Sequence, residues 1–304
     1  MDGMTATGET KAGDGAATRR RMRAVVFAFV GIGAALGWAW LVAMVAAMIA
    51  ATDMSALGPG MGLLNRINGF ADLSPEMRAG LAALCGPVTS VWSAADWATV
   101  AAMWVAMVAA MMLPSAAPVL TAYADMGAER VARGETMVSP VVLGLGYLAV
   151  WLGFAALATA AQGALTTARL LTPAGVPVSQ VLGGTTMIAA GLYQFTPLKL
   201  ACLSRCRAPR PFFADHWSDR VGGVFRMGVA QGVDCMGCCW ALMVAMFAVG
   251  VMNVVWIALF GVISTVEKLL PSAWISRVVG AILIAWGLAT LASSPIGAVW
   301  LGRG

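Results

Sequence analysis

Long apolar stretches limit what this chain can fold into more than any other feature of its sequence. Seven of them approach or exceed the ~20 residues that an α-helix needs to cross the hydrocarbon of a bilayer. Charged residues make up only 11% of the chain, which is too few to cover a soluble surface. The sequence therefore predicts an all-α fold, a polytopic transmembrane helix bundle of about seven spans. The expected spans cover residues 24–51, 97–113, 139–164, 181–201, 225–249, 251–267 and 276–293.

Glycine and proline set two of the expected boundaries. Residues 227–266 contain a single charge, Asp234, and one helix of that length would be about twice as long as the hydrocarbon is thick. We expect the chain to turn at "GVMN", residues 250–253, because Gly and Asn suit tight turns. In "MMLPSAAP" we expect Pro114 and Pro118 to end the second span.

Basic residues predict the orientation of the bundle. Fifteen of the nineteen Arg and Lys residues lie in the N-terminal segment or in the expected loops 114–138, 199–226 and 268–277. Short loops rich in Arg and Lys stay on the cytoplasmic side. We therefore expect a multi-pass protein with a cytoplasmic N-terminus and an external loop at 52–96.

The same pattern divides the chain into two parts. Residues 1–23 are polar, rich in Gly, Ala and Thr, and end in an Arg cluster. We expect them to form a disordered basic cytoplasmic tail. Residues 24–304 are expected to form a single transmembrane helical domain, with the apolar 52–96 loop lying on the bundle or in the membrane interface.

The stretch "DCMGCCWALMVAMFAVGVM", residues 234–252, concentrates sulfur inside an expected span. Positions three and four apart share a face of a helix, so Cys235, Cys238 and Cys239 line one side, followed by Met243. Thiolates and thioethers are soft ligands that select Cu(I), and thiolates also bind zinc. Two alternatives stay open: thiol redox chemistry, and plain packing, because Cys and Met are common in buried helices.

Further candidate ligands lie outside this ladder. An acid inside a span is costly unless it is paired, hydrated or ligating, which makes Asp234 a candidate for balancing charge or relaying a proton. Met107 belongs to a stripe of methionines spaced by four residues, for which core packing is the alternative. Cys202 and Cys206 share a helix face among several arginines, either as reactive thiols or as incidental parts of a basic anchor.

Three of these segments resemble a bacterial family described only as predicted metal-binding integral membrane proteins, a domain of unknown function. The resemblance rests on "MMLPSAAP", on "YQFTPLKLACLSRCRAP" and on "CMGCCWALMVAMFAVGVMN" followed by the "EK" of residues 267–268, and covers roughly residues 95–270. It implies a bound metal and a bacterial inner (cytoplasmic) membrane. In that family a histidine stands four residues before the first cysteine of the last motif, where this chain has Gln231.

These observations favour a metal-binding membrane protein over an enzyme. The expected cargo is copper, with zinc as the second candidate, and the expected role is copper(I) handling, delivery or transport through a Cys/Met site. The competing hypothesis is a non-catalytic accessory subunit of a larger membrane complex. In either case the expected partners are the lipid bilayer and another membrane protein, and no feature of the sequence indicates nucleic acid.

Overall fold

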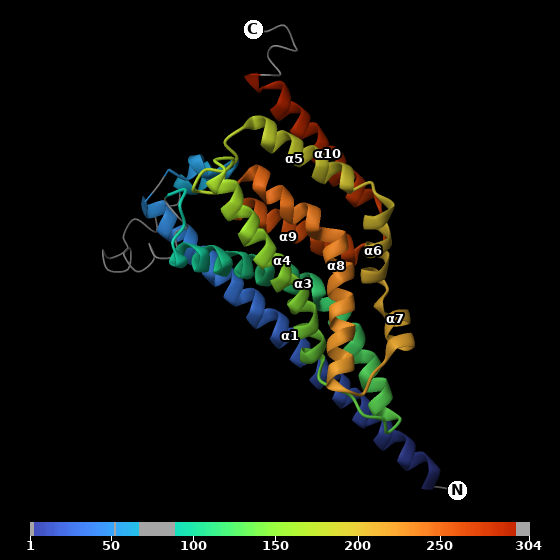
Figure 1. The fold of residues 1–304 in the computed structure, drawn as a ribbon. Helices are drawn as coiled ribbons and strands as arrows, with labels where there is room; N and C mark the ends of the chain where they lie inside the picture. The colour runs from blue at the N-terminus through green and yellow to red at the C-terminus, as the bar shows by residue number, and fades with distance from the viewer. Residues whose placement is uncertain (1–2, 52, 67–88, 296–304) are drawn as a thin grey trace.

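Every regular element within residues 3–51, 53–66 and 89–295, the residues that the structure describes, is a helix. The structure is a computed structural model. The long helices α1, α3 and α4 run alternately toward the two ends of the molecule, α5, α6 and α7 follow one another in the same direction, and α8 packs against α4, α6 and α9 (Figure 1). The helices are α1 (Gly3–Ala51), η1 (Met54–Leu57), η2 (Met61–Arg66), α3 (Ala94–Ala132), α4 (Pro140–Thr167), α5 (Gln180–Tyr193), α6 (Pro197–Arg207), α7 (Pro209–His216), α8 (Val221–Val249), α9 (Val254–Leu269) and α10 (Trp274–Ala292).

Five of the described helices, α1, α3, α4, α8 and α10, are long and apolar enough to cross a membrane. The all-α fold and the bundle of apolar helices are thus confirmed. The other two expected spans are also helical but shorter. α9 has 16 residues, roughly 24 Å, and the segment expected at 181–201 is divided between α5 and α6. The number of spans, seven, therefore stays a prediction.

α1 extends to Gly3, into the segment expected to be a disordered tail. Lengthening a helix costs far less than starting one, so even a segment rich in Gly and Thr as well as Ala can continue a helix that is already formed. The Arg cluster at the end of this segment pairs with α3. Arg23 binds both carboxylate oxygens of Asp125 at 2.8 and 2.7 Å, and Arg19 lies 3.5 Å from Glu129.

α3 corrects one expected boundary, because it continues through Pro114 and Pro118 to Ala132. The prediction that these prolines end the helix is wrong, and residues 114–132 of the expected 114–138 loop are helical. Prolines are tolerated in such helices where neighbouring side chains satisfy the backbone groups they disturb. In the same turn Ser115 Oγ and Tyr147 Oη donate to the Met112 carbonyl at 2.9 and 3.1 Å, whereas the carbonyl that loses its helical partner at Pro114 is that of Ala110.

Glycines allow α4 and α8 to approach closely. A Cβ added to Gly146 would overlap the carbonyl oxygen of Phe225, and one added to Gly228 would overlap that of Leu143. Small residues at such crossings let helix backbones come into contact. Gly146 is followed by Tyr147, whose side chain is thereby directed at α8.

The turn between α8 and α9 occurs where the sequence predicts it. Gly250 has φ 101°, a left-handed conformation that favours glycine, and the Asn253 side chain caps α9. Asn253 Nδ2 and Trp256 Nε1 also donate to the Pro59 carbonyl at 3.0 and 3.1 Å. The described start of the 52–96 loop thus packs on the bundle, as expected, and residues 67–88 lie outside the described residues.

A break at residues 194–196 separates α5 from α6, with Pro197 as the first residue of α6. The break turns α6 alongside α8 (Figure 1). Arg207 then fastens α6 to the end of α9. Its Nε donates to the Glu267 carbonyl at 2.8 Å and its Nη2 to the Ser272 carbonyl at 2.9 Å. A cation there complements the free carbonyls of a helix C-terminus.

Candidate metal centre

The helical geometry of α8 gathers three thiols in the interior. Cys235, Cys238 and Cys239 are each at most 1% exposed. Their Sγ atoms all lie within 4.8 Å of one another, and those of Cys238 and Cys239 are 3.2 Å apart. Within the described part of the chain, this thiol cluster is the group of His, Cys, Asp and Glu side chains that could hold a metal ion.

The spacing of the thiols suits a soft metal ion. A metal–sulfur bond of roughly 2.3 Å places two bound thiolates roughly 4–4.6 Å apart. The Sγ–Sγ separations in the cluster run from 3.2 Å to at most 4.8 Å. Small side-chain rotations are therefore enough to bring them into that range. Two or three sulfurs can therefore meet at one ion without any movement of α8.

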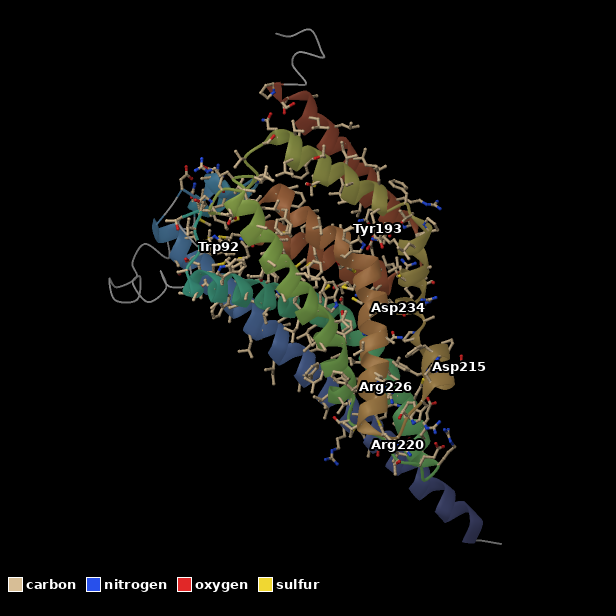
Figure 2. All side chains as sticks on the ribbon, viewed as in Figure 1. Trp92, Tyr193, Asp215, Arg220, Arg226 and Asp234 are labelled. Atoms are coloured by element: carbon tan, nitrogen blue, oxygen red, sulfur yellow. The ribbon has the colours of Figure 1, made fainter. Side chains whose placement is uncertain are left out.

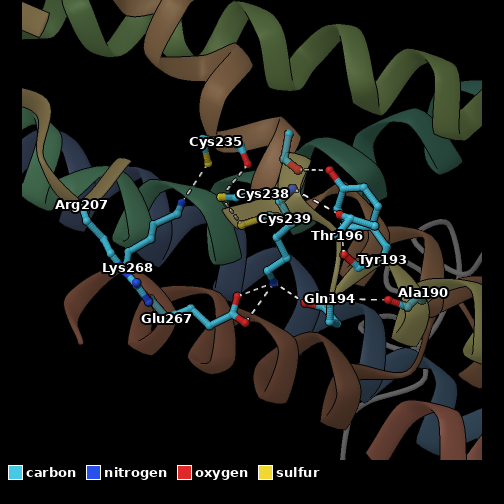
Figure 3. Close-up of polar contacts among 12 residues, drawn as sticks. Ala190, Tyr193, Gln194, Thr196, Arg207, Cys235, Cys238, Cys239, Glu267 and Lys268 are labelled. Carbon is cyan, nitrogen blue, oxygen red and sulfur yellow. Dashed lines mark hydrogen bonds and ion pairs between the residues drawn. The ribbon is translucent and has the colours of Figure 1, made fainter. Parts of the chain in front are cut away.

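Three other helices contribute polar groups to the cluster. Tyr147 Oη of α4 lies 2.8 Å from Cys235 Sγ. Lys268 Nζ of α9 donates to the same sulfur at 2.9 Å (Figure 3). Lys268 Nζ also donates to Ser115 Oγ of α3 at 2.8 Å. The Lys268 residue is 6% exposed, so its positive charge lies inside the bundle, directly beside the thiols.

α6 adds sulfur from a second helix. Cys206 is 2% exposed, and its thiol lies close to that of Cys238. Cys202, one turn earlier, is half-buried, and its sulfur fills the space above Gly237 of α8. The sequence predicts that these two cysteines share a face, and the structure turns that face toward α8.

A second buried charge lies beside the cluster. Lys199 Nζ donates to both carboxylate oxygens of Glu267 at 2.9 and 2.8 Å and to Gln194 Oε1 (Figure 3). Both charged side chains are fully buried. Their pairing answers the cost of placing a charge in an apolar interior.

Lys199 and Lys268 are buried in the bundle, although the count of basic residues placed both in loops. They are 0% and 6% exposed within the helix bundle. The sequence carries a weak signal for Lys268, since it follows Glu267 directly at the end of an apolar segment. No pattern in the sequence shows that Tyr147 and Lys268 meet the same thiol, because their separations from Cys235 along the chain are large.

Asp234 lies apart from the thiol cluster. It occupies the middle of α8 (Figure 2), where its carboxylate pairs with Arg205 of α6 at 3.2 Å. Its side chain is 13% exposed. Neighbouring residues on a helix point about 100° apart, so Asp234 faces α6 at the edge of the bundle while Cys235 faces the interior. The ion pair satisfies the acid without a metal.

The methionine candidates are in the core. Met107 on α3 and Met243 on α8 are both 0% exposed. Complete burial is expected of a thioether ligand and of a packing residue alike. Their role as ligands therefore stays a prediction.

Gln231 occupies the expected histidine position and is 1% exposed. Neither its Nε2 nor its Oε1 has a hydrogen-bond partner among the described residues. Unpaired buried polar atoms are costly. Because Gln231 precedes Cys235 by four residues, it lies one turn before the thiols on the same face.

Fold and site together define a class of protein: a bundle of apolar helices with a buried thiol cluster suited to a soft metal ion. The profile of the family PpoB2, described as a copper chaperone, matches residues 101–290, and the chain belongs to this family. The matched region includes all three thiols, Lys268 and both cysteines of α6. No curated protein and no solved structure matches the chain.

Proposed function

We propose that this protein is a membrane-embedded copper(I) carrier that holds the ion on the thiols of Cys235, Cys238 and Cys239. The observation that carries the proposal is the burial of three thiols within 4.8 Å of one another, inside the region that matches a copper chaperone family. The ion is cargo, bound and released without a chemical reaction, so we propose a carrier and not an enzyme.

Ligand number favours copper(I) over zinc, and charge suits a copper(I) site with two thiolates and one neutral thiol. Two thiolates and one Cu(I) ion carry a single net negative charge, which the Lys268 ammonium beside Cys235 neutralises. A net charge in an apolar interior is costly, so the neutral arrangement is the stable one. Zinc requires four ligands in a closed site, whereas Cu(I) is satisfied by fewer soft ligands.

Additional sulfur lies close to the proposed site. Cys206 contacts Cys238 and can serve as a further thiolate ligand. Met243 follows Cys239 by four residues on the same helix face, and Met107 is buried on α3, so both are candidate thioethers. Asp234, which is paired with Arg205, has no part in the proposed ligand set.

Location and partner follow from the same proposal. The apolar helices support a multi-pass protein of the bacterial inner membrane. The basic residues at one end support a cytoplasmic N-terminus: Arg19, Arg23 and Arg210 meet acids of α3 there. A carrier must pass its ion on, and we propose delivery to another membrane protein or movement across the membrane.

Metal analysis tests the proposal. Full-length protein purified under reducing conditions and incubated with Cu(I) should retain about one copper per chain. The Cys235→Ser, Cys238→Ser and Cys239→Ser triple variant should retain none, because serine is not a soft ligand. Met236→Leu is the matched control, since it removes a sulfur from the same helix and conserves volume. Equal copper in the triple variant and the wild type would contradict the proposal.

A further inference from the structure

α6 provides a row of sulfur from the surface of the bundle to the thiol cluster. Cys202 is half-buried, and Cys206, one turn further along α6, is 2% exposed. Cys206 lies close to Cys238 where α6 packs on α8, and Cys238 Sγ in turn lies 3.2 Å from Cys239 Sγ. Accessibility therefore falls step by step along the row, from the outermost thiol to the fully buried ones.

Gly237 brings Cys202 against the cluster helix. A Cβ at this position would overlap the Cys202 sulfur, so any larger residue would displace the Cys202 side chain. The carbonyl of Gly237 also accepts a hydrogen bond from Tyr193 Oη. These contacts place the Cys202 thiol beside Gly237, the residue that directly precedes Cys238 in α8.

A charged group marks the outer end of the row. Cys202 lies near the ion pair of Arg205 and Asp234. The Arg205 side chain is 68% exposed and the Asp234 side chain 13%. An exposed cation beside a half-buried thiol is suited to meeting an anionic copper(I)–thiolate donor.

We propose that Cys202 and Cys206 form a transfer path along which copper(I) moves between an external thiolate donor and the cluster of Cys235, Cys238 and Cys239. The path rests on the proposed copper carrier function. At each step the receiving sulfur forms a bond to copper before the donor sulfur releases it. The receiving thiol gives its proton to the released thiolate, and copper remains Cu(I) throughout.

A transfer path and plain packing predict different rates of copper uptake when Cys202 is replaced. If the two cysteines only fill space, replacing Cys202 with serine leaves copper uptake unchanged. If they carry the ion, the same replacement slows uptake and leaves the amount of copper bound at equilibrium unchanged, since the α8 thiols determine that amount.

The test is stopped-flow transfer of copper from the Cu(I)–glutathione complex to full-length protein in detergent. Cys202→Ser and Cys206→Ser should each slow transfer by at least about tenfold. Ser204→Ala, an exposed position of the same helix, should transfer at the wild-type rate.

Each outcome separates the path from the carrier function. Wild-type protein that takes up no copper would contradict the carrier function itself. Equal rates of copper uptake by the wild type and Cys202→Ser would overturn the transfer path and leave the carrier function standing. If Ser204→Ala slowed transfer equally, the path would also be overturned, because the cause would be a disturbed α6. If Cys202→Ser bound less copper at equilibrium, it would be overturned as well, because Cys202 would then be a ligand of the resting site.

Discussion

Among single residues, Lys268 is the one that connects the thiols to the rest of the bundle. Its ammonium contacts Cys235 and Ser115 from a position that is 6% exposed, and no carboxylate of the described residues pairs with it. Buried charges are retained where they are paired or functional. A bound anionic copper(I)–dithiolate unit gives this cation its counter-ion.

Replacing Lys268 tests this role. Lys268→Met should weaken Cu(I) affinity by about tenfold, ~1.4 kcal/mol, because the loaded site then keeps a net negative charge. Lys268→Arg preserves the charge and should lose less. Competition with a chromogenic Cu(I) chelator measures both affinities. Equal affinities for wild type and Lys268→Met would show that the cation does not stabilise the loaded site.

Position 231 offers a test of the histidine that this chain lacks beside the thiols. An imidazole at this position would supply a nitrogen ligand to the three thiols, and three cysteines with one histidine make a zinc site. Gln231→His should therefore tighten zinc binding by at least about tenfold. Gln231→Leu, which also removes the unpaired amide, should show no gain. Zinc competition titrations in which both variants bind alike would place position 231 outside the site.

At the scale of elements, the bundle depends on close helix contacts that hydropathy does not reveal. α4 and α8 meet through Gly146 and Gly228, and α6 meets α8 through Gly237. Hydropathy and proline position also placed the end of α3 too early. The physical reason is that Ser115 and Tyr147 bond to the backbone beside Pro114, which no local pattern shows.

The α4–α8 contact predicts a stability difference between two glycines of one helix. Gly146→Ala should lower the free energy of unfolding by about 1–3 kcal/mol, because its Cβ meets the backbone of α8. Gly153→Ala has open space around the new Cβ and should raise stability by about 0.5–1 kcal/mol. Denaturation in detergent compares them, and equal effects would mean that the helices do not touch at Gly146.

At the scale of the whole molecule, the sequence was sufficient for the class of fold and for the three thiols. Apolar stretches locate membrane helices directly, and i, i+3 and i+4 spacing is fixed by one helix. The surroundings of the thiols are different, because Lys268, Tyr147 and Cys206 reach them from three separate helices. Lys199 and Lys268 resemble loop charges in the sequence. Their burial depends on which helices pack together, and the sequence does not show that.

The most direct test of the account is copper K-edge X-ray absorption on full-length protein loaded with Cu(I). The account predicts two or three sulfur neighbours at roughly 2.3 Å, and the loss of this sulfur shell in the Cys235→Ser, Cys238→Ser and Cys239→Ser triple variant. Met236→Leu should leave the spectrum unchanged. A copper shell made of nitrogen or oxygen, or a sulfur shell that survives in the triple variant, would contradict a copper site on the α8 thiols.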